Sequence, residues 1–304
     1  MRVDPNYATN LVNSLDQAQA NEQQLTNELS SGVSFNTLSQ NPVGAGEDVL
    51  LISQMQQDDT FTQSASAIGG QLQVADSALG SVVSQLTQAI SLATSANNGT
   101  MNASDVKSIA TQISGILDEV QSLANTSYEG QYIFGGGQAS TTPFTTSTAS
   151  SPAVTTYNGD LDINYVETPG GQKIQLNVPG SQIFLGSGTN SVFGALNSLV
   201  ADYSSGTANT TQAISDTEAL STALNYVSQQ RVTLDNSITQ LTAASDAVSS
   251  SEMQLTTAQN NLMQADVATV STKLSQSETQ QTALEDVIAE LNSSSNDLFS
   301  KLPI

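Results

Sequence analysis

The sequence predicts a mainly α-helical protein with an inserted β domain, in which long helical arms from the two ends of the chain pair as an antiparallel coiled coil or helical bundle. Three observations support this fold class. Apolar residues recur at helical spacing near both ends. Short alternating runs separated by Gly and Pro fill the middle. The 304 residues are enough for two or more domains.

The strongest helical signal lies in the C-terminal part. An apolar residue returns at every seventh position, and this period keeps one side of a helix apolar. No Pro or Gly interrupts the run. A polar rod of this kind is marginal unless its stripe is covered, so we expect these positions to form a core within one subunit. They are Leu220, Val227, Leu234, Leu241, Val248, Leu255 and Leu262.

The N-terminal arm begins with one amphipathic helix, expected over residues 6–31 and ended by Gly32 as a left-handed cap. A loop is expected through Gly46, because Asn41-Pro42 and two glycines disfavour a continuous helix. Helix should resume over about residues 47–96.

Two details of the N-terminal arm bear on packing. The pair Gly69-Gly70 lies inside the second predicted helix and indicates close packing or a local weakness there. After a turn at residues 97–100, Asn102 or Ser104 is expected to cap a third helix that runs to about Ser127.

The period then changes from helical to strand-like. Tyr157-Asn158-Gly159-Asp160 predicts one hairpin, and the runs 161–166 and 172–178 predict a second hairpin around residues 167–171. A helix over about residues 191–203 and a polar linker then lead to the long rod.

These elements divide the chain into three parts. We expect an N-terminal helical arm over residues 1–130, an inserted β-rich domain over 131–200, and a C-terminal helical arm over 201–304. The two arms would form the coiled-coil core, which includes the terminal segments 1–40 and 265–304.

The stripes of the two terminal segments are long and thin, so one molecule buries too little of them to offset the entropy of the chain. We therefore expect neighbouring subunits to complete their burial. The predicted self-association residues are Leu11, Leu15, Leu25, Leu29, Val267, Val270, Leu274, Leu284, Ile288, Leu291 and Leu298.

Composition weighs against enzymes and several partner classes. The net charge is −22, from 28 acidic and 6 basic residues, which disfavours nucleic acid and anionic membrane surfaces as partners. No apolar run is long enough for a membrane span, and the first residues show no cleavable signal peptide. Cys and His are absent, which removes the commonest nucleophiles, general bases and metal ligands.

No motif predicts a catalytic, cofactor or metal site. The run Gly135-Gly136-Gly137 follows a helix rather than preceding one and has no Lys-Ser/Thr after it, so it does not fit a phosphate loop. The paired carboxylates Asp58-Asp59 and Glu285-Asp286 are expected on solvated helix faces. We therefore expect a protein that is not an enzyme and has no cofactor.

Several segments resemble a known family. Leu29–Asn36 followed by Asn41–Ala45 is similar to the N-terminal signature of bacterial flagellin and its relatives. Tyr128–Gly136, Asp266–Ser271 and Leu298–Leu302 resemble later segments of the same family, in the same order. The Pro42-Val43-Gly44-Ala45 form favours the members that join the flagellar hook to the filament.

The resemblance implies a structural protein of the bacterial flagellum that is exported without a cleaved signal peptide and is extracellular once assembled. It would form a homo-oligomeric ring between hook-associated protein 1 and flagellin, with residues 131–200 as the outer domain and residues 1–40 and 265–304 as the innermost terminal segments. It implies as further partners the type III export apparatus and an export chaperone that holds the C-terminal arm. Two alternatives remain at this point: flagellin itself, as a filament subunit, and a secreted enzyme or sugar-binding adhesin carried by the β region.

Overall fold

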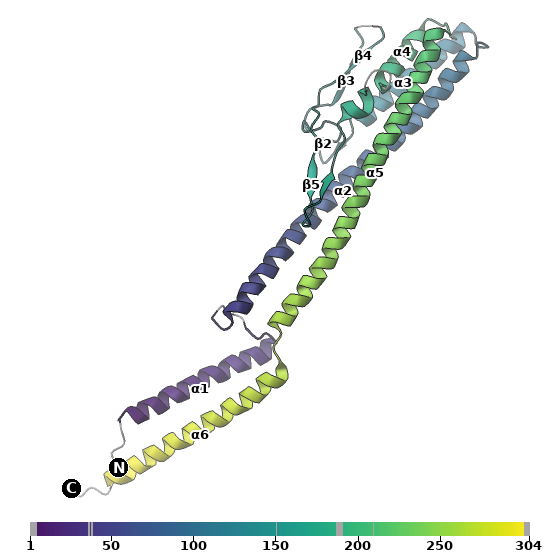
Figure 1. Ribbon diagram of the computed structural model, residues 1–304. Coiled ribbons are helices and arrows are strands. Elements are labelled where there is room, and N and C mark those ends of the chain that lie inside the picture. The colour runs from purple at the N-terminus through teal and green to yellow at the C-terminus, as the bar shows by residue number, and fades with distance from the viewer. Residues whose placement is uncertain are drawn as a thin grey trace. The chain divides into compact units, whose positions relative to one another are not determined.

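The computed structural model describes residues 5–35, 37, 39–149, 151–186, 191–208 and 210–300. The chain is mainly helical with small inserted β hairpins, which confirms the predicted fold class (Figure 1). It divides into two compact units. We call residues 1–56 with 252–304 the terminal unit, and residues 57–251 the central unit.

Most of the predicted helices are present with bounds close to those expected. The first helix, the helix after the β region and the uninterrupted rod all appear, and the rod ends where the sequence pattern changes register. The helices are α1 (Pro5–Ser31), α2 (Pro42–Asn97), α3 (Ala103–Ala124), α4 (Val192–Ser204), α5 (Thr211–Met263) and α6 (Val267–Ser300).

Helix α2 begins earlier than predicted, because Asn41 and Pro42 start the helix rather than prevent it. The Asn41 side-chain oxygen accepts a hydrogen bond from the Gly44 N–H at 3.0 Å. The Asn41 carbonyl accepts from the Ala45 N–H at 2.9 Å. Pro42 occupies the first helical position, where a missing N–H has no cost. The predicted loop is therefore wrong over residues 42–46.

Helix α3 has the predicted cap. The Asn102 side chain accepts hydrogen bonds from the N–H groups of Ser104 and Asp105, at 2.9 and 3.0 Å. The helix ends at Ala124 instead of Ser127, because the next residues form strand β1 (Ser127–Tyr128), which pairs with β2 (Gln131–Tyr132).

The β region consists of antiparallel two-stranded hairpins. Strand β3 (Phe144–Ser147) pairs with β4 (Val154–Tyr157), and β5 (Tyr165–Glu167) pairs with β6 (Lys173–Gln175). The β5–β6 hairpin matches the one predicted around residues 167–171.

The hairpin predicted at Tyr157–Asp160 is wrong. Tyr157 ends strand β4, and the following residues are held by partners that are distant in sequence. The Asp160 carboxylate accepts from the Gly137 N–H at 2.6 Å. The Tyr157 hydroxyl lies 2.9 Å from the Phe134 carbonyl oxygen, and burial raises the pKa of this phenol to about 12. The turn residues thus anchor the hairpin to the preceding loop.

A cluster of aromatic rings fills the core beneath these hairpins. The ring centroid of Phe144 lies 5.1 Å from those of Tyr157 and Phe193 and 5.2 Å from that of Phe184. Phe184 belongs to a short π-helical turn, η1 (Ser181–Leu185), and also contacts Phe134 edge-on at 5.5 Å. The β region therefore shares one continuous core with the helices of the central unit.

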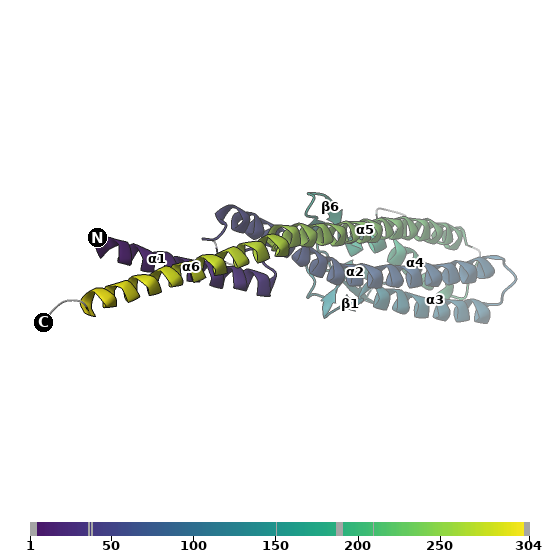
Figure 2. The same cartoon turned by 90° about the horizontal axis from the view of Figure 1, so that it is seen from below.

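Helices α2 and α5 run antiparallel along the central unit, and both views show them side by side (Figures 1 and 2). Asn97 at the end of α2 donates to Thr217 Oγ1 near the start of α5, at 3.1 Å. The predicted glycine pair provides close packing at Gly70, where an added Cβ would lie 2.6 Å from the Tyr128 hydroxyl. The absence of a side chain at Gly70 thus gives room for Tyr128 on the surface of α2.

Candidate assembly surfaces

The terminal helices α1 and α6 pack against each other as a two-helix pair in the terminal unit (Figure 1). The two helices pack along each other, so each covers one side of the other's apolar stripe. Most of the predicted self-association residues of the pair are partly buried: Leu11, Leu15, Leu25, Leu274, Leu284, Ile288 and Leu291.

The remaining predicted self-association residues show the extremes of exposure. Val270 is buried, whereas Leu29 is 36% exposed and Val267 is 56% exposed. The side chain of Leu298 lies outside the described residues. The pair therefore leaves much of the predicted stripe accessible.

One buried contact of the pair involves small residues that the apolar pattern did not include. Ser277 is buried, and its hydroxyl donates to the Ala18 carbonyl at 3.3 Å. Ala18 is buried as well. Ser277 is not among the predicted self-association residues, which pass from Leu274 to Leu284. It lies one helical turn after Leu274, on the same side of α6, but the small partner residue Ala18 decides that it is buried.

The predicted intrasubunit core on α5 is buried to different depths along the helix. Leu220 and Val227 are completely buried, and Leu234, Leu241 and Val248 are nearly so. The last two residues, Leu255 and Leu262, are only partly buried, and they belong to the terminal unit.

The segments that lead into α2 and out of α5 are joined by short backbone pairing in the terminal unit. The Ala265 N–H donates to the Gly32 carbonyl at 2.9 Å, and the Ser34 N–H donates to the Met263 carbonyl at 2.6 Å. Asp266 then starts α6, because its carboxylate accepts from the N–H groups of Ala268 and Thr269. Hydrogen bonds from Thr269 lower the pKa of Asp266. This cap separates α6, which begins at Val267, from α5, which ends at Met263.

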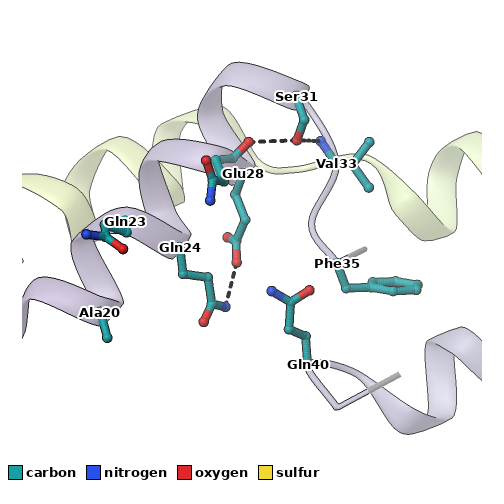
Figure 3. Close-up of a pocket in the computed structure, with 9 residues that line it drawn as sticks. Ala20, Gln23, Gln24, Glu28, Ser31, Val33, Phe35 and Gln40 are labelled. Carbon is teal, nitrogen blue, oxygen red and sulfur yellow. Dashed lines mark hydrogen bonds between the residues drawn. The ribbon is translucent and has the colours of Figure 1, made fainter. Parts of the chain in front are cut away.

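A pocket of about 220 Å³ lies beside the C-terminal turns of α1 (Figure 3). Four of its nine lining residues are amides, among them Gln23, Gln24 and Gln40, and its apolar lining includes Val33 and Phe35. The Gln24 side chain donates to the Glu28 carboxylate at 2.9 Å. The pocket thus offers amide donors and acceptors around one carboxylate that already has a partner, which suits polar contact rather than acid–base chemistry.

Two wider grooves run along the α1–α6 pair. One, of about 520 Å³, lies between the helices, and its eight lining residues carry no charge. They are Ser14, Gln17, Ala18, Asn21, Gln280, Ala283, Leu284 and Val287. The other, of about 760 Å³, lies on α6 and shares Gln280 and Ala283 with the first.

One ion pair joins α2 to α5 in the central unit. Arg231 Nε and Nη2 donate to the two carboxylate oxygens of Asp76, at 2.5 and 3.0 Å. The guanidinium lies beside Gly80, where an added Cβ would be 3.5 Å from it. The pair is a two-point contact of the kind that fixes orientation as well as distance.

No helix within the described ranges is long and apolar enough to cross a membrane. Among the same residues, acidic side chains do not gather in a group of three or more that could hold a metal ion.

Residues 5–139 match the bacterial flagellin N-terminal helical region. Over these residues the chain is similar to the flagellin N-terminal family. This confirms the resemblance seen in the sequence, and it covers α1, α2, α3 and the first hairpin.

Two curated relatives are flagellar hook-associated protein 3 from different bacteria. The protein of Salmonella typhimurium is 26% identical over 176 residues, which is 58% of this chain and 54% of that protein. The protein of Escherichia coli is 30% identical over 118 residues, which is 38% of this chain and 37% of that protein. The matches therefore span about half of one relative and about a third of the other.

A solved structure supports the fold over a larger share of the chain. Flagellar hook-associated protein 3 from Legionella pneumophila superposes with a TM-score of 0.62 at 14% identity. The superposition covers 70% of this chain and 98% of that one. At this identity the likeness establishes the arrangement of the helices and hairpins, and the function is argued separately below.

Proposed function

We propose that this chain is a structural protein that joins the flagellar hook to the filament and performs no catalysis. The proposal rests on the two curated relatives, which carry the same name and match the chain over parts of its length. The flagellin-type N-terminal region and the solved hook-associated protein fold support it.

The mechanism is packing between copies of the chain. The predicted self-association residues on α1 and α6 are mostly only partly buried within one chain. Neighbouring copies that cover these stripes would remove further apolar surface from water, which stabilises at about 25 cal/mol per Å². We therefore propose a ring of copies held by α1 and α6, with residues 131–200 as the outer domain and Leu220–Val248 as the core of each subunit.

The remaining partners belong to the same proposal. The ring would contact hook-associated protein 1 on one side and flagellin on the other. The chain would leave the cell through the type III export apparatus and reside on the extracellular flagellum.

A gene deletion tests the junction role. Cells that lack the chain should still secrete flagellin, but the flagellin should appear unpolymerised in the medium, because the filament has no ring on which to start. Filaments of normal length on the deletion strain would contradict the proposal. Long filaments formed by the purified chain alone would instead indicate a filament subunit.

Before export, we propose that α6 is held by a chaperone. Its stripe is only partly covered by α1 within one chain, and exposed amphipathic helices bind grooves of partner proteins. Cytosolic partners captured by the whole chain and by a chain truncated after Asp266 decide this point. Retention of the same small partner by both chains would place the chaperone site outside α6.

A further inference from the structure

The first turns of α2 expose large aliphatic side chains on the side of the helix that is turned away from α5. Val43 is 73% exposed, Leu50 70% and Val49 62%. The opposite side of the same turns holds Leu51 and Met55, which are partly buried. At about 100° per residue, the outward side carries Val43, Gly46, Val49, Leu50 and Ser53. We call these five residues the α2 face.

Gly46 in the centre of the α2 face is not required by packing within the chain. A Cβ added at Gly46 would have no atom within 4 Å, apart from adjacent residues and nearby helix backbone, in the part of the chain that the structure describes. At Gly44, by contrast, an added Cβ would lie 2.5 Å from the Asn41 side chain. Glycine destabilises a helix interior relative to alanine. A glycine between exposed valine and leucine side chains gives room for the backbone of a second helix.

The α2 face carries no charge, although the chain has a net charge of −22. Asp48 lies on another side of the helix, where it accepts a hydrogen bond from Gln259 of α5 at 2.8 Å. Glu47 is exposed and borders the face, one turn after Val43 and one turn before Leu50. A second copy would therefore meet no like charge within the five residues of the face, and Glu47 would lie at the edge of the contact.

We propose that the α2 face packs against the α1–α6 pair of a second copy of this chain. The groove of about 520 Å³ between α1 and α6 matches it, because its lining is also uncharged and includes the apolar residues Leu284 and Val287. A contact between two different surfaces is heterologous and repeats from copy to copy, as a ring requires.

The size of the α2 face sets the strength of this contact. Three large aliphatic side chains and their neighbours cover much less than the roughly 800 Å² per partner of a stable protein–protein interface. Single pairs of copies therefore associate weakly, and the contact becomes persistent where copies repeat. This inference rests on the proposed function, in which copies of the chain repeat in a ring, and it names one surface through which neighbouring copies contact each other.

A photo-crosslinker tests the contact in the purified full-length chain. p-Benzoylphenylalanine replaces Leu50 in one chain and Gln73, an exposed residue of the same helix, in the control. Both are illuminated over a series of protein concentrations at about 1 M NaCl, where the Debye length is only about 3 Å. Position 50 should give several-fold more two-chain product than position 73, with the second peptide from α1 or α6. Equal yields, or a second peptide from residues 57–251, would overturn the proposal.

A glycine substitution separates association from folding. Gly46→Ala should raise the melting temperature by a few degrees, because alanine favours the helix, and should lower the two-chain product at position 50. Gly115→Ala on α3 is the matched control, since an added Cβ there also meets no atom within 4 Å among the described residues. It should raise the melting temperature without changing the product. An unchanged product in Gly46→Ala would overturn the proposal, whatever the deletion strain shows about the junction role.

Discussion

Helix α5 carries one apolar repeat through both compact units, but the repeat is buried to different depths in each. From Leu220 to Val248, in the central unit, it is almost completely buried. Leu255 and Leu262, in the terminal unit, are only partly buried. The spacing of the leucines and valines is the same throughout, so the depth of burial depends on the number of neighbouring elements and not on the repeat itself.

The two units also differ in what covers their helices. In the central unit, α2 and α5 share a core with α3, α4 and the hairpins, and Phe144, Phe184 and Phe193 fill it. In the terminal unit, the buried residues of the α1–α6 pair include Val270 and the small residues Ala18 and Ser277. The central unit is therefore stabilised by its own chain, whereas the terminal unit has surface left for other chains.

A charge in the buried part of the α5 repeat should have the largest effect. Leu241→Asp places a carboxylate at a position that is 3% exposed, without a partner to compensate it. We expect a loss of about 4 kcal/mol or more in the free energy of unfolding of the central unit. Urea titration followed by circular dichroism measures it. A loss below about 1 kcal/mol, as for surface positions, would mean that this repeat is not the core of the unit.

Removal of one ring from the aromatic cluster should have a slightly smaller effect. Phe144→Ala leaves a cavity beside three other rings and should cost about 3–4 kcal/mol. Tyr165→Ala is the matched control, because Tyr165 is exposed on strand β5. If both variants lost the same stability, the β region would not be part of the central core.

Limited proteolysis compares the two units directly. In a dilute monomer, we expect segments 1–40 and 265–304 to be removed first, while residues 57–251 persist. The local opening of the α1–α6 pair should cost about 2–3 kcal/mol less than opening of the central unit, since less apolar surface is lost. Cleavage sites mapped by mass spectrometry over time report the order. If both units were cleaved at the same rate, the terminal unit would not be less stable than the central unit.

A charge on α6 should affect assembly far more than stability. Leu284 is partly buried in the α1–α6 pair, so Leu284→Asp should cost only about 1–2 kcal/mol in the monomer. The same charge would be buried unpaired once a second copy covers the groove, and assembly should then fail. Sedimentation of the chain with its neighbours, beside a melting curve of the monomer, separates the two effects. Normal assembly by this variant would contradict the role of the stripe.

The smallest expected effect concerns pH and the central unit alone. Burial, together with Asp216, raises the pKa of Asp202. A raised pKa in the folded state means that protonation favours folding, so this group's contribution is largest in acid and is lost as the pH rises through the folded pKa. Asp202→Asn should therefore be slightly more stable than the original chain at pH 7, with the gap closing below about pH 4. If the stability difference between Asp202→Asn and the original chain grew in acid, the direction assigned to the pKa shift of Asp202 would be wrong.

The sequence predicted the long helices well because their patterns are local. The stripe from Leu220 onward, the cap at Asn102 and the left-handed Gly32 each depend on neighbours within a few turns. The errors occur where partners are far apart in sequence. Tyr157–Asp160 has the composition of a hairpin turn. However, Asp160 accepts a hydrogen bond from Gly137 and the Tyr157 hydroxyl donates to the Phe134 carbonyl, so these residues bind a preceding loop instead of closing a hairpin.

The candidate assembly surfaces were predictable in part. Apolar spacing located the stripes of α1 and α6, but it could not reveal that Ser277 contacts Ala18, because the partner residue decides whether a small polar side chain is buried. The α2 face was not found from sequence either. The run around Leu50 reads as an ordinary helix, and only the structure shows that Val49 and Leu50 face away from α5 while Gly46 has open space beside it.

The ion pair between Asp76 and Arg231 has a consequence for how α2 and α5 find their alignment. A stripe that repeats every seven residues makes equivalent apolar contacts with its partner helix after a shift of seven residues, about 10 Å along the helix. Leucine and valine contacts alone would therefore make several alignments nearly equal in energy. Arg231 meets both oxygens of Asp76 in one of them only, beside the space left by Gly80. Together with the hydrogen bond from Asn97 to Thr217, this pair favours one alignment over the others, and so sets which residues of α2 and α5 face each other.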